Sequence, residues 1–281
     1  MATIGGVNAY RGLGTWVDVY DYSKPFSGVR PPVSPSTVDR MAAQGIKTIF
    51  LQAAMNDRRT PNDLVDRNLL GAFLQRAHAH RMNVVGWYLP KFVDLDTDMR
   101  HIRAIRNFRV AGQRFDGLAL DLEDITSVPD LKTRNERLVQ LSYRARAFVG
   151  SGTLGAIVLP PVQLEVVAPN YWPMFPWRRL RPFYDAWLPM SYFTFRSPLG
   201  GNYRDAFKYT EESVRRLRNN LGFPFALVHV IGGIADVTTP GDVEGLRRTV
   251  WATRAVGWSL YDYNTTKKAA WPQLRTITAR R

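Results

Sequence analysis

Apolar runs of five to seven residues recur along the whole chain, and most are followed by a polar turn and a segment with helical periodicity. Runs of this length bounded by turn residues are typical of strands buried inside a domain. The strands predicted in this way are Thr15–Tyr20, Thr48–Ala53, Val84–Leu89, Gly117–Glu123, Gly155–Leu159, Ala186–Tyr192, Phe225–Ile231 and Trp258–Tyr263. The helices predicted between them are Ser36–Gln44, Asp63–His80, Asp96–Ala111, Lys132–Val149, Asp205–Asn220 and Asp242–Ala255.

Strands that alternate with helices imply parallel pairing through right-handed crossovers. Because no flexible linker divides the chain, we predict an α/β fold: a single (β/α)8 TIM barrel over residues 1–281. An irregular excursion rich in proline and tryptophan is expected at about residues 160–182. The alternative is a doubly wound open sheet, which would need a glycine-rich phosphate loop after the first strand. The sequence there is DYSKP (residues 21–25).

The fourth predicted strand carries the most informative pattern, FDGLALDLED at residues 115–124. Successive side chains of a strand point to opposite faces, so its leucines share one face and Ala119, Asp121 and Glu123 share the other. We expect the leucines to pack on the helices and the two carboxylates to point into the barrel. Repulsion between them, together with partial burial, should raise the pKa of one carboxyl, as a general acid requires.

The pattern Asp116-Gly117-x-x-x-Asp121-x-Glu123 resembles the fourth-strand signature of family-18 glycoside hydrolases, which are chitinase-like barrels. The resemblance implies that Glu123 is the general acid and that Asp121 orients the N-acetyl group of the substrate. It also implies a structural role for Asp116. The chain departs from the family pattern at Ala119, where the family has its middle aspartate.

Two further segments are similar to the same family, YDAWLPMSY (184–192) to its sixth strand and GWSLYDY (257–263) to its eighth. Met190 and Tyr192 fall on one face of the sixth strand. The resemblance implies that the Tyr192 hydroxyl lies within hydrogen-bond reach of Asp121 or of the reacting sugar. It also implies that Trp258 forms the floor of a sugar subsite.

Other polar and aromatic residues at predicted strand ends are candidates for a sugar cleft, because pyranose rings stack on aromatic faces and hydrogen-bond to carboxylates. These candidates are Asp18, Tyr20, Gln52, Tyr88, Asp124 and Asp262. Two interpretations of Asp18 remain open, a contact with a sugar or catalytic carboxyl and a cap for the turn that follows. The second catalytic role, as base, nucleophile or orienting group, is assigned to Asp121, Asp18 or Asp262.

Composition narrows the possible partners. The chain has 38 Lys and Arg against 24 Asp and Glu, a net charge of +14, which favours anionic partners such as a cell-envelope polymer or nucleic acid. Basic residues never form a run longer than two and no nucleic-acid-binding signature is present, so nucleic acid is not favoured. The chain has no cysteine, which excludes disulfides and cysteine nucleophiles. No metal-ligand spacing is present, and no metal or cofactor is expected.

The compartment remains open. No apolar run reaches the ~18–20 residues that span a bilayer, so no membrane span is predicted. The amino-terminal residues lack the charged start and apolar core of a signal peptide. The protein is expected to be secreted or bound to the cell envelope if a signal peptide has been removed, and cytoplasmic otherwise.

The function predicted from these residues is that of a glycoside hydrolase-like enzyme, which cleaves a polysaccharide or cell-envelope glycan with Glu123 as general acid. Ala119 keeps open the alternative of a lectin-like barrel that binds carbohydrate without cleaving it. A weaker alternative is a barrel that binds nucleic acid or another anionic polymer, and it rests on the net charge alone.

Overall fold

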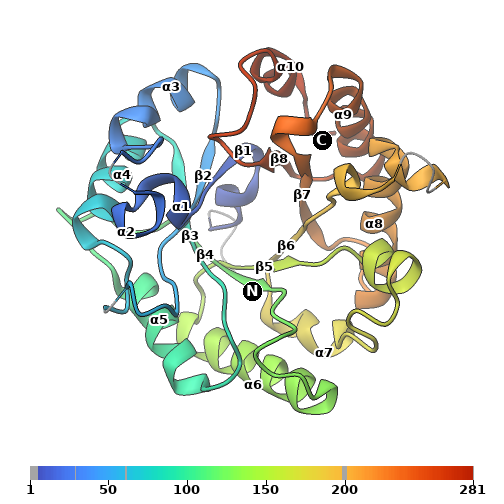
Figure 1. Ribbon diagram of the computed structural model, residues 1–281, viewed down its shortest axis with the longest axis horizontal. Helices are drawn as coiled ribbons and strands as arrows, with labels where there is room; N and C mark the ends of the chain where they lie inside the picture. Colours follow the sequence, from blue (N-terminus) through green and yellow to red (C-terminus); the bar gives the residue numbers. More distant parts are fainter. Residues whose placement is uncertain (1–5, 29, 61, 198–200, 281) are drawn as a thin grey trace.

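The structure is a computed structural model that describes residues 6–28, 30–60, 62–197 and 201–280. Eight parallel strands form a closed barrel, in which each strand pairs with its neighbours in sequence and β8 pairs with β1. Helices surround this ring of strands, as Figure 1 shows in a view along the barrel. The predicted single (β/α)8 TIM barrel is confirmed.

The strands are close to the predicted runs. They are β1 (Gly12–Val17), β2 (Thr48–Gln52), β3 (Asn83–Tyr88), β4 (Gly117–Leu122), β5 (Leu154–Val158), β6 (Ala186–Pro189), β7 (Leu227–Ile234) and β8 (Gly257–Tyr261). The predicted runs extend furthest beyond the strands at the carboxyl ends of β1 and β6, each by three residues. β1 ends one residue before Asp18, whose side chain accepts hydrogen bonds from the N–H groups of Tyr20 (2.7 Å) and Asp21 (3.2 Å) and so begins a helix. β6 ends three residues before Tyr192, because tight backbone hydrogen bonds turn the chain there.

The longer helices cover the outside of the barrel. They are α3 (Val38–Ala43), α4 (Arg67–Ala79), α5 (Leu95–Asn107), α6 (Leu131–Val149), α8 (Ala206–Leu221), α9 (Pro240–Thr253) and α10 (Ala270–Thr276). Aspartate side chains fix the starts of four of them by accepting hydrogen bonds from backbone N–H groups. These are Asp66 for α4, Asp94 for α5, Asp130 for α6 and Asp205 for α8. Within the described residues, no helix combines the length and apolar character needed to cross a membrane.

Short helical segments occur in several of the connections. The helices α1 (Val19–Tyr22) and α2 (Lys24–Ser27) follow β1 at the carboxyl end of the barrel. After β5 the chain forms a π-helical turn at Gln163–Val167, then α7 (Trp177–Leu180) and a 3-10 turn at Arg181–Phe183.

The strands separate two hydrophobic layers. On β4, Leu118, Leu120 and Leu122 belong to the large outer layer between strands and helices, whereas Ala119 belongs to a smaller layer inside the barrel. The predicted assignment of faces on β4 is therefore correct. It directs Asp121 toward the inside of the barrel as well.

A 3-10 turn at Gly6–Tyr10 closes the amino-terminal end of the barrel. The Tyr10 hydroxyl donates a hydrogen bond of 2.7 Å to the Leu118 carbonyl. The Tyr10 carbonyl lies 2.9 Å from Nδ1 of His229, and Nε2 of His229 lies 3.0 Å from Oγ of Ser259. Because a carbonyl only accepts hydrogen bonds, Nδ1 carries the proton and Nε2 accepts from the serine. Burial keeps this histidine neutral at pH 7.

Burial lowers the pKa of His229 from 6.5 to about 4. Between these values the unfolded chain binds a proton that the folded protein does not, so the free energy of unfolding should decrease as the pH falls below 6.5. By pH 4 this group alone should remove about 3 kcal/mol. Urea unfolding at pH 7 and pH 4 measures the change. His229→Asn, which cannot titrate, should be less stable at pH 7 but lose less on acidification; equal losses in the two proteins would contradict the prediction.

Candidate active site

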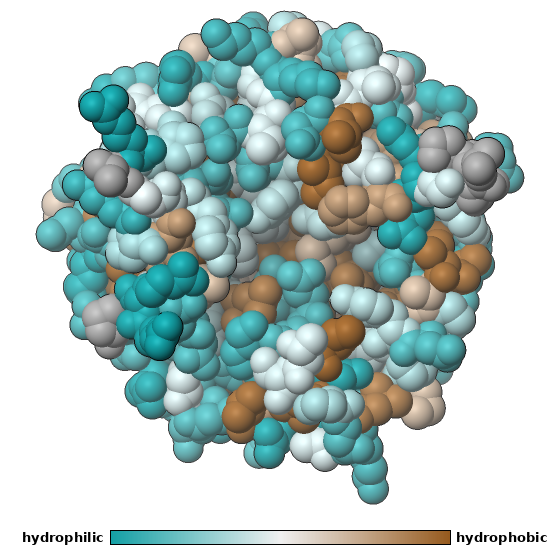
Figure 2. Space-filling model, viewed as in Figure 1, coloured by the Kyte–Doolittle hydropathy of each residue, from teal (hydrophilic) through white to brown (hydrophobic). Residues whose placement is uncertain are grey.

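A cleft of about 400 Å³ opens at the carboxyl ends of the strands, the end that carries the catalytic residues in TIM-barrel enzymes. Figure 2 shows that the molecule is hollowed near the centre of this face. The lining is rich in aromatic and aliphatic side chains and contains three carboxylates. It consists of Trp16, Asp18, Tyr20, Gln52, Met55, Trp87, Leu89, Asp121, Glu123, Ile157, Met190, Tyr192, Phe195, Ile231, Ile234 and Tyr261.

Asp121 and Glu123 enter the cleft from the end of β4. Asp121 is buried, and within the described part of the chain its Oδ1 atom has no hydrogen-bond partner. Burial, and then the charge of Glu123, raise the pKa of Asp121 well above its ordinary value. Burial, and then the charge of Asp124, raise the pKa of Glu123, which is only half-buried. The pair therefore keeps a proton at pH values where exposed carboxyl groups have lost theirs, and Glu123 is its more accessible member.

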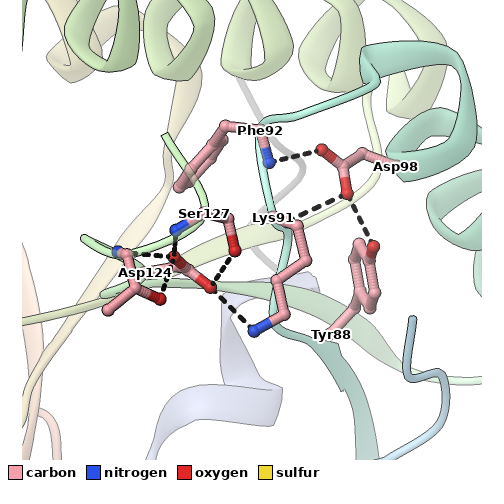
Figure 3. A network of polar contacts seen from close by, with 7 residues as sticks. Tyr88, Lys91, Phe92, Asp98, Asp124 and Ser127 are labelled. Carbon is pink, nitrogen blue, oxygen red and sulfur yellow. Dashed lines mark hydrogen bonds and ion pairs between the residues drawn. The ribbon is translucent and has the colours of Figure 1, made fainter. Parts of the chain in front are cut away.

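Lys91, from the loop after β3, opposes this rise in the pKa of the two carboxyl groups (Figure 3). Nζ of Lys91 lies 2.7 Å from Oδ2 of Asp124, the residue that follows Glu123. The charge of Lys91 lowers the pKa of both Asp121 and Glu123, in opposition to their burial. Asp124 is held in turn by the backbone N–H (2.8 Å) and hydroxyl (3.0 Å) of Ser127. The ammonium group of Lys91 is thus held close to Asp121 and Glu123.

Asp98 on α5 fixes the loop that carries Lys91. Its carboxylate accepts hydrogen bonds from the backbone N–H groups of Lys91 (3.1 Å) and Phe92 (2.9 Å). It also accepts a hydrogen bond of 2.6 Å from the Tyr88 hydroxyl (Figure 3). Asp98 is buried, so these bonds are shielded from water.

Two tyrosines and a third carboxylate lie on the other side of the cleft. The Tyr261 hydroxyl donates a hydrogen bond of 2.6 Å to Oδ2 of Asp18, and the Tyr261 and Tyr192 ring centroids are 6.1 Å apart. Burial, then the charges of Glu123 and Asp121, raise the pKa of Tyr192 well above its ordinary value. Tyr192 therefore stays a neutral hydroxyl close to both carboxylates. Within the described residues its hydroxyl makes no hydrogen bond to Asp121.

Stacked aromatic rings form the floor of the cleft. Trp16 lies against Phe50 with ring centroids 4.4 Å apart and nearly parallel planes. Its ring centroid lies 6.0 Å from that of Trp87 and 6.2 Å from that of Tyr261, and its Nε1 donates a hydrogen bond of 2.9 Å to Ser259. These contacts hold flat apolar surfaces beside the carboxylates, an arrangement suited to the faces of sugar rings.

Most of the predicted cleft residues reach the cleft. Asp18, Tyr20, Gln52, Met190 and Tyr192 all line it, together with the two carboxylates of β4. Asp18 combines the two interpretations left open by the sequence, because it caps α1 and also faces the cleft. Tyr20 stands at the rim, where 51% of its surface is exposed.

Tyr88 and Trp258 point away from the cleft, so their predicted positions are wrong. Both belong to the outer hydrophobic layer. The Tyr88 hydroxyl bonds to Asp98 on α5, and Nε1 of Trp258 donates a hydrogen bond of 3.0 Å to the Leu274 carbonyl on α10. Their strand neighbours point inward instead.

The prediction that Asp124 and Asp262 contact the substrate is also wrong, because both carboxylates form hydrogen bonds within turns. The Asp124 side chain is only 3% exposed and accepts its hydrogen bonds from Lys91 and the turn after it. Asp262 accepts bonds of 2.9 Å from the backbone N–H and hydroxyl of Thr265. Neither belongs to the lining of the cleft as the described residues define it.

The site residues that were not identified from the sequence include Trp87, Phe195, Tyr261 and Lys91. Trp87 and Tyr261 were missed because their strands were predicted to begin at Val84 and Trp258, one residue too late, which assigns alternate positions to the wrong face. Phe195 and Lys91 lie on irregular loops, where no periodicity indicates direction.

Asp18, Asp21 and Asp262 form an acidic cluster beside the cleft, with carboxylate oxygens within 4.8 Å of one another. Burial, and then the charges of Asp262 and Asp18, raise the pKa of Asp21 to about 8. A proton on Asp21 therefore relieves the repulsion in this cluster at neutral pH. Three carboxylates at this spacing could also hold a cation.

No protein-family model matches the chain, and no curated protein matches its sequence. Solved structures are similar over nearly its whole length. They include the spore cortex-lytic enzyme SleL of Bacillus cereus (9% identity, TM-score 0.65, 95% of this chain and 74% of that one). They also include a family-18 chitinase of Cycas revoluta (13%, 0.64, 94% and 98%) and a class V chitinase of Pseudomonas fluorescens (9%, 0.62, 95% and 99%). The chain thus has a family-18-like TIM barrel, a glycoside hydrolase-like fold.

Proposed function

We propose that this protein is a glycoside hydrolase-like enzyme that cleaves a polysaccharide or cell-envelope glycan in the cleft at the carboxyl ends of the strands. The observation that carries the proposal is the Asp121–Glu123 pair, whose burial and mutual repulsion keep a proton inside an aromatic cleft. Burying two carboxyl groups without a hydrogen-bond partner for Asp121 costs stability, which a catalytic role would explain. Neighbouring structures named as chitinases and a cortex-lytic enzyme support a glycan as the substrate class.

Glu123 would donate the proton, because it is the more accessible member of the pair. The proton passes to the glycosidic oxygen as the bond from that oxygen to the anomeric carbon breaks; water then supplies the hydroxyl of the new reducing end, and its remaining proton returns to Glu123. Asp121 would then orient the sugar or stabilise the positive charge that develops on the ring. Trp87 and Tyr261 would hold neighbouring sugar rings against the floor of the cleft.

The test is the release of new reducing ends from a panel of purified glycans, including chitin oligomers and peptidoglycan. Hydrolysis of at least one glycan by the wild-type protein is the expected result. Binding without cleavage would instead support the alternative of a lectin-like barrel. The observation that favours this alternative is Ala119, which is buried in the apolar layer inside the barrel where the resembling family has a carboxylate.

Tyr192→Phe is expected to slow hydrolysis by roughly ten- to a hundredfold, because it removes a neutral hydroxyl that faces the reacting carboxylates and hydrogen-bonds in the transition state. The melting temperature should change little, since the hydroxyl has no partner in the described residues whose loss would destabilise the fold. Steady-state kinetics beside thermal melts measure both effects. Unchanged turnover would remove Tyr192 from the mechanism and leave Glu123 untouched.

Lys91→Met is expected to move the alkaline side of the pH–rate profile to higher pH. Lys91 lowers the pKa of Glu123 and Asp121, so removing its charge lets both values rise and the acid stays protonated further into the alkaline range. Lys91→Arg, which keeps the charge, is the matched control and should shift the profile less. A profile that stays in place, or moves to lower pH, would contradict this arrangement of charges.

A further inference from the structure

A second cavity, of about 420 Å³, lies at the amino-terminal end of the barrel, opposite the cleft. Its walls come from the start of β4, the end of α5 and the loops before β4 and β5. Polar and charged side chains supply much of the lining. They are Asn83, Arg106, Arg114, Asp116, Ser151 and Thr153. Neither the predicted cleft nor the proposed hydrolysis uses any of these side chains.

This cavity carries a net positive charge. Arg106 and Arg114 line it, and the charges of Arg109 and Arg114 act on the half-buried Arg106, lowering its pKa after burial. Across the described ranges, no carboxylate forms an ion pair with any of these three arginines. Asp116 is the one acidic group in the lining, so the two arginines that line the cavity face one carboxylate, a local net charge of +1.

In the described part of the chain Asp116 makes no ion pair with either lining arginine, and its Oδ2 atom is held by other groups. It accepts a hydrogen bond of 2.7 Å from the backbone N–H of Val84 and lies 2.9 Å from Nε2 of His78. That bond, above all, raises the pKa of His78, so this partner of Asp116 gains its positive charge at a higher pH than an exposed imidazole does. The structural role that the sequence implied for Asp116 fits these contacts.

Gly152 provides the space for Arg106. A Cβ atom at this position would lie 3.2 Å from Nη2 of Arg106 and 3.0 Å from a methyl group of Val149. The guanidinium group therefore lies over the glycine of the loop that also supplies Ser151 and Thr153 to the cavity. Two guanidinium groups, neither of which donates a side-chain hydrogen bond to another described residue, thus lie in the same polar cavity as the hydroxyl groups of Ser151 and Thr153.

We propose that this cavity binds a small anion that carries a phosphoryl group. A phosphoryl group offers three charged oxygens, enough to accept paired hydrogen bonds from two guanidinium groups and single bonds from Ser151 and Thr153. A carboxylate has only two oxygens and leaves donors without partners. The cavity is larger than a phosphate ion, so a phosphorylated small molecule fits as well as inorganic phosphate. The net charge of +14 raises the local concentration of either.

Isothermal titration calorimetry of the full chain at pH 7 tests the proposal, with ionic strength held constant by sodium chloride. Inorganic phosphate, glucose 6-phosphate and acetate are the three probes. Saturable binding of at least one phosphoryl probe, and at least tenfold weaker binding of acetate, is the expected result. Tighter binding of glucose 6-phosphate than of phosphate would identify a phosphorylated molecule as the ligand, and the reverse order would identify the free ion.

Arg106→Gln and Arg114→Gln should each weaken phosphoryl binding at least tenfold. Arg103→Gln is the matched control, because it removes the same charge from α5 one turn away but does not line the cavity, and it should change binding less than threefold. Thermal melts without ligand show whether each variant is folded. Equal weakening of phosphoryl binding by all three substitutions would mean that the anion is attracted by the overall charge of the protein and not bound in the cavity, which would contradict the proposal. The absence of saturable binding to the wild type would also overturn it. Neither result bears on glycan hydrolysis in the cleft.

Discussion

Replacing Glu123 with glutamine is expected to lower the rate of glycan hydrolysis by about 10²- to 10⁴-fold, the usual contribution of a positioned general acid. Glutamine has nearly the same shape as the protonated carboxyl but cannot transfer a proton. The change also removes the repulsion between Glu123 and Asp121, so the melting temperature should stay the same or rise. Initial rates on the most active glycan, measured together with thermal melts, give both numbers.

Glu211→Gln on α8 is the matched control, since it makes the same chemical change far from the cleft. It should leave the rate within about twofold of wild type, because surface substitutions have small effects. Affinity for the intact glycan should survive in Glu123→Gln, because the aromatic floor is unchanged. Full activity of Glu123→Gln would exclude Glu123 as the general acid, and the fold would be unaffected by that result.

Ala119→Asp should destabilise the protein by about 3 kcal/mol or more at neutral pH. Ala119 is fully buried in the apolar layer inside the barrel, beside Trp87 on β3 and Gly155 on β5. A carboxyl group there would lie two residues from Asp121 on the same face, so burial and repulsion would both oppose its ionisation. Urea unfolding at pH 7 measures the loss.

The sign of the pH dependence makes this prediction specific. A buried carboxyl with a raised pKa is tolerated when protonated, so the deficit of Ala119→Asp relative to wild type should shrink as the pH falls toward 4. Ala119→Asn adds similar volume without the charge, and its deficit should not change with pH. An aspartate variant as stable as wild type at pH 7 would show that this layer accepts a third carboxylate, as the resembling family does.

The sequence predicted the faces of β4 because leucines alternate there with Ala119, Asp121 and Glu123. It failed on β3 and β8 because those strands are buried on both faces and are apolar or aromatic at nearly every position. In VVGWYL (84–89) nothing distinguishes Trp87 from Tyr88 by polarity, and an error of one residue reverses every side chain.

The hydrophobic pattern of the sequence could not predict contacts between loops. Lys91 lies 7 residues from Asp98 and 33 residues from Asp124, and the parallel pairing of β3 with β4 brings the two loops together. Asp124 and Asp262 look in the sequence like cleft residues at strand ends, yet local turns use their carboxylates. Periodicity locates a strand end and its inward positions, whereas hydrogen bonds formed within the loops decide which polar side chains remain free for a ligand.

A crystal structure of Glu123→Gln soaked with a chitin tetrasaccharide tests the central claim most directly. The account predicts sugar rings against Trp87 and Tyr261, with one glycosidic oxygen about 2.6–3.2 Å from the side chain at position 123. An oligosaccharide bound in the cleft with every glycosidic oxygen remote from that side chain, or bound on another face, would contradict it.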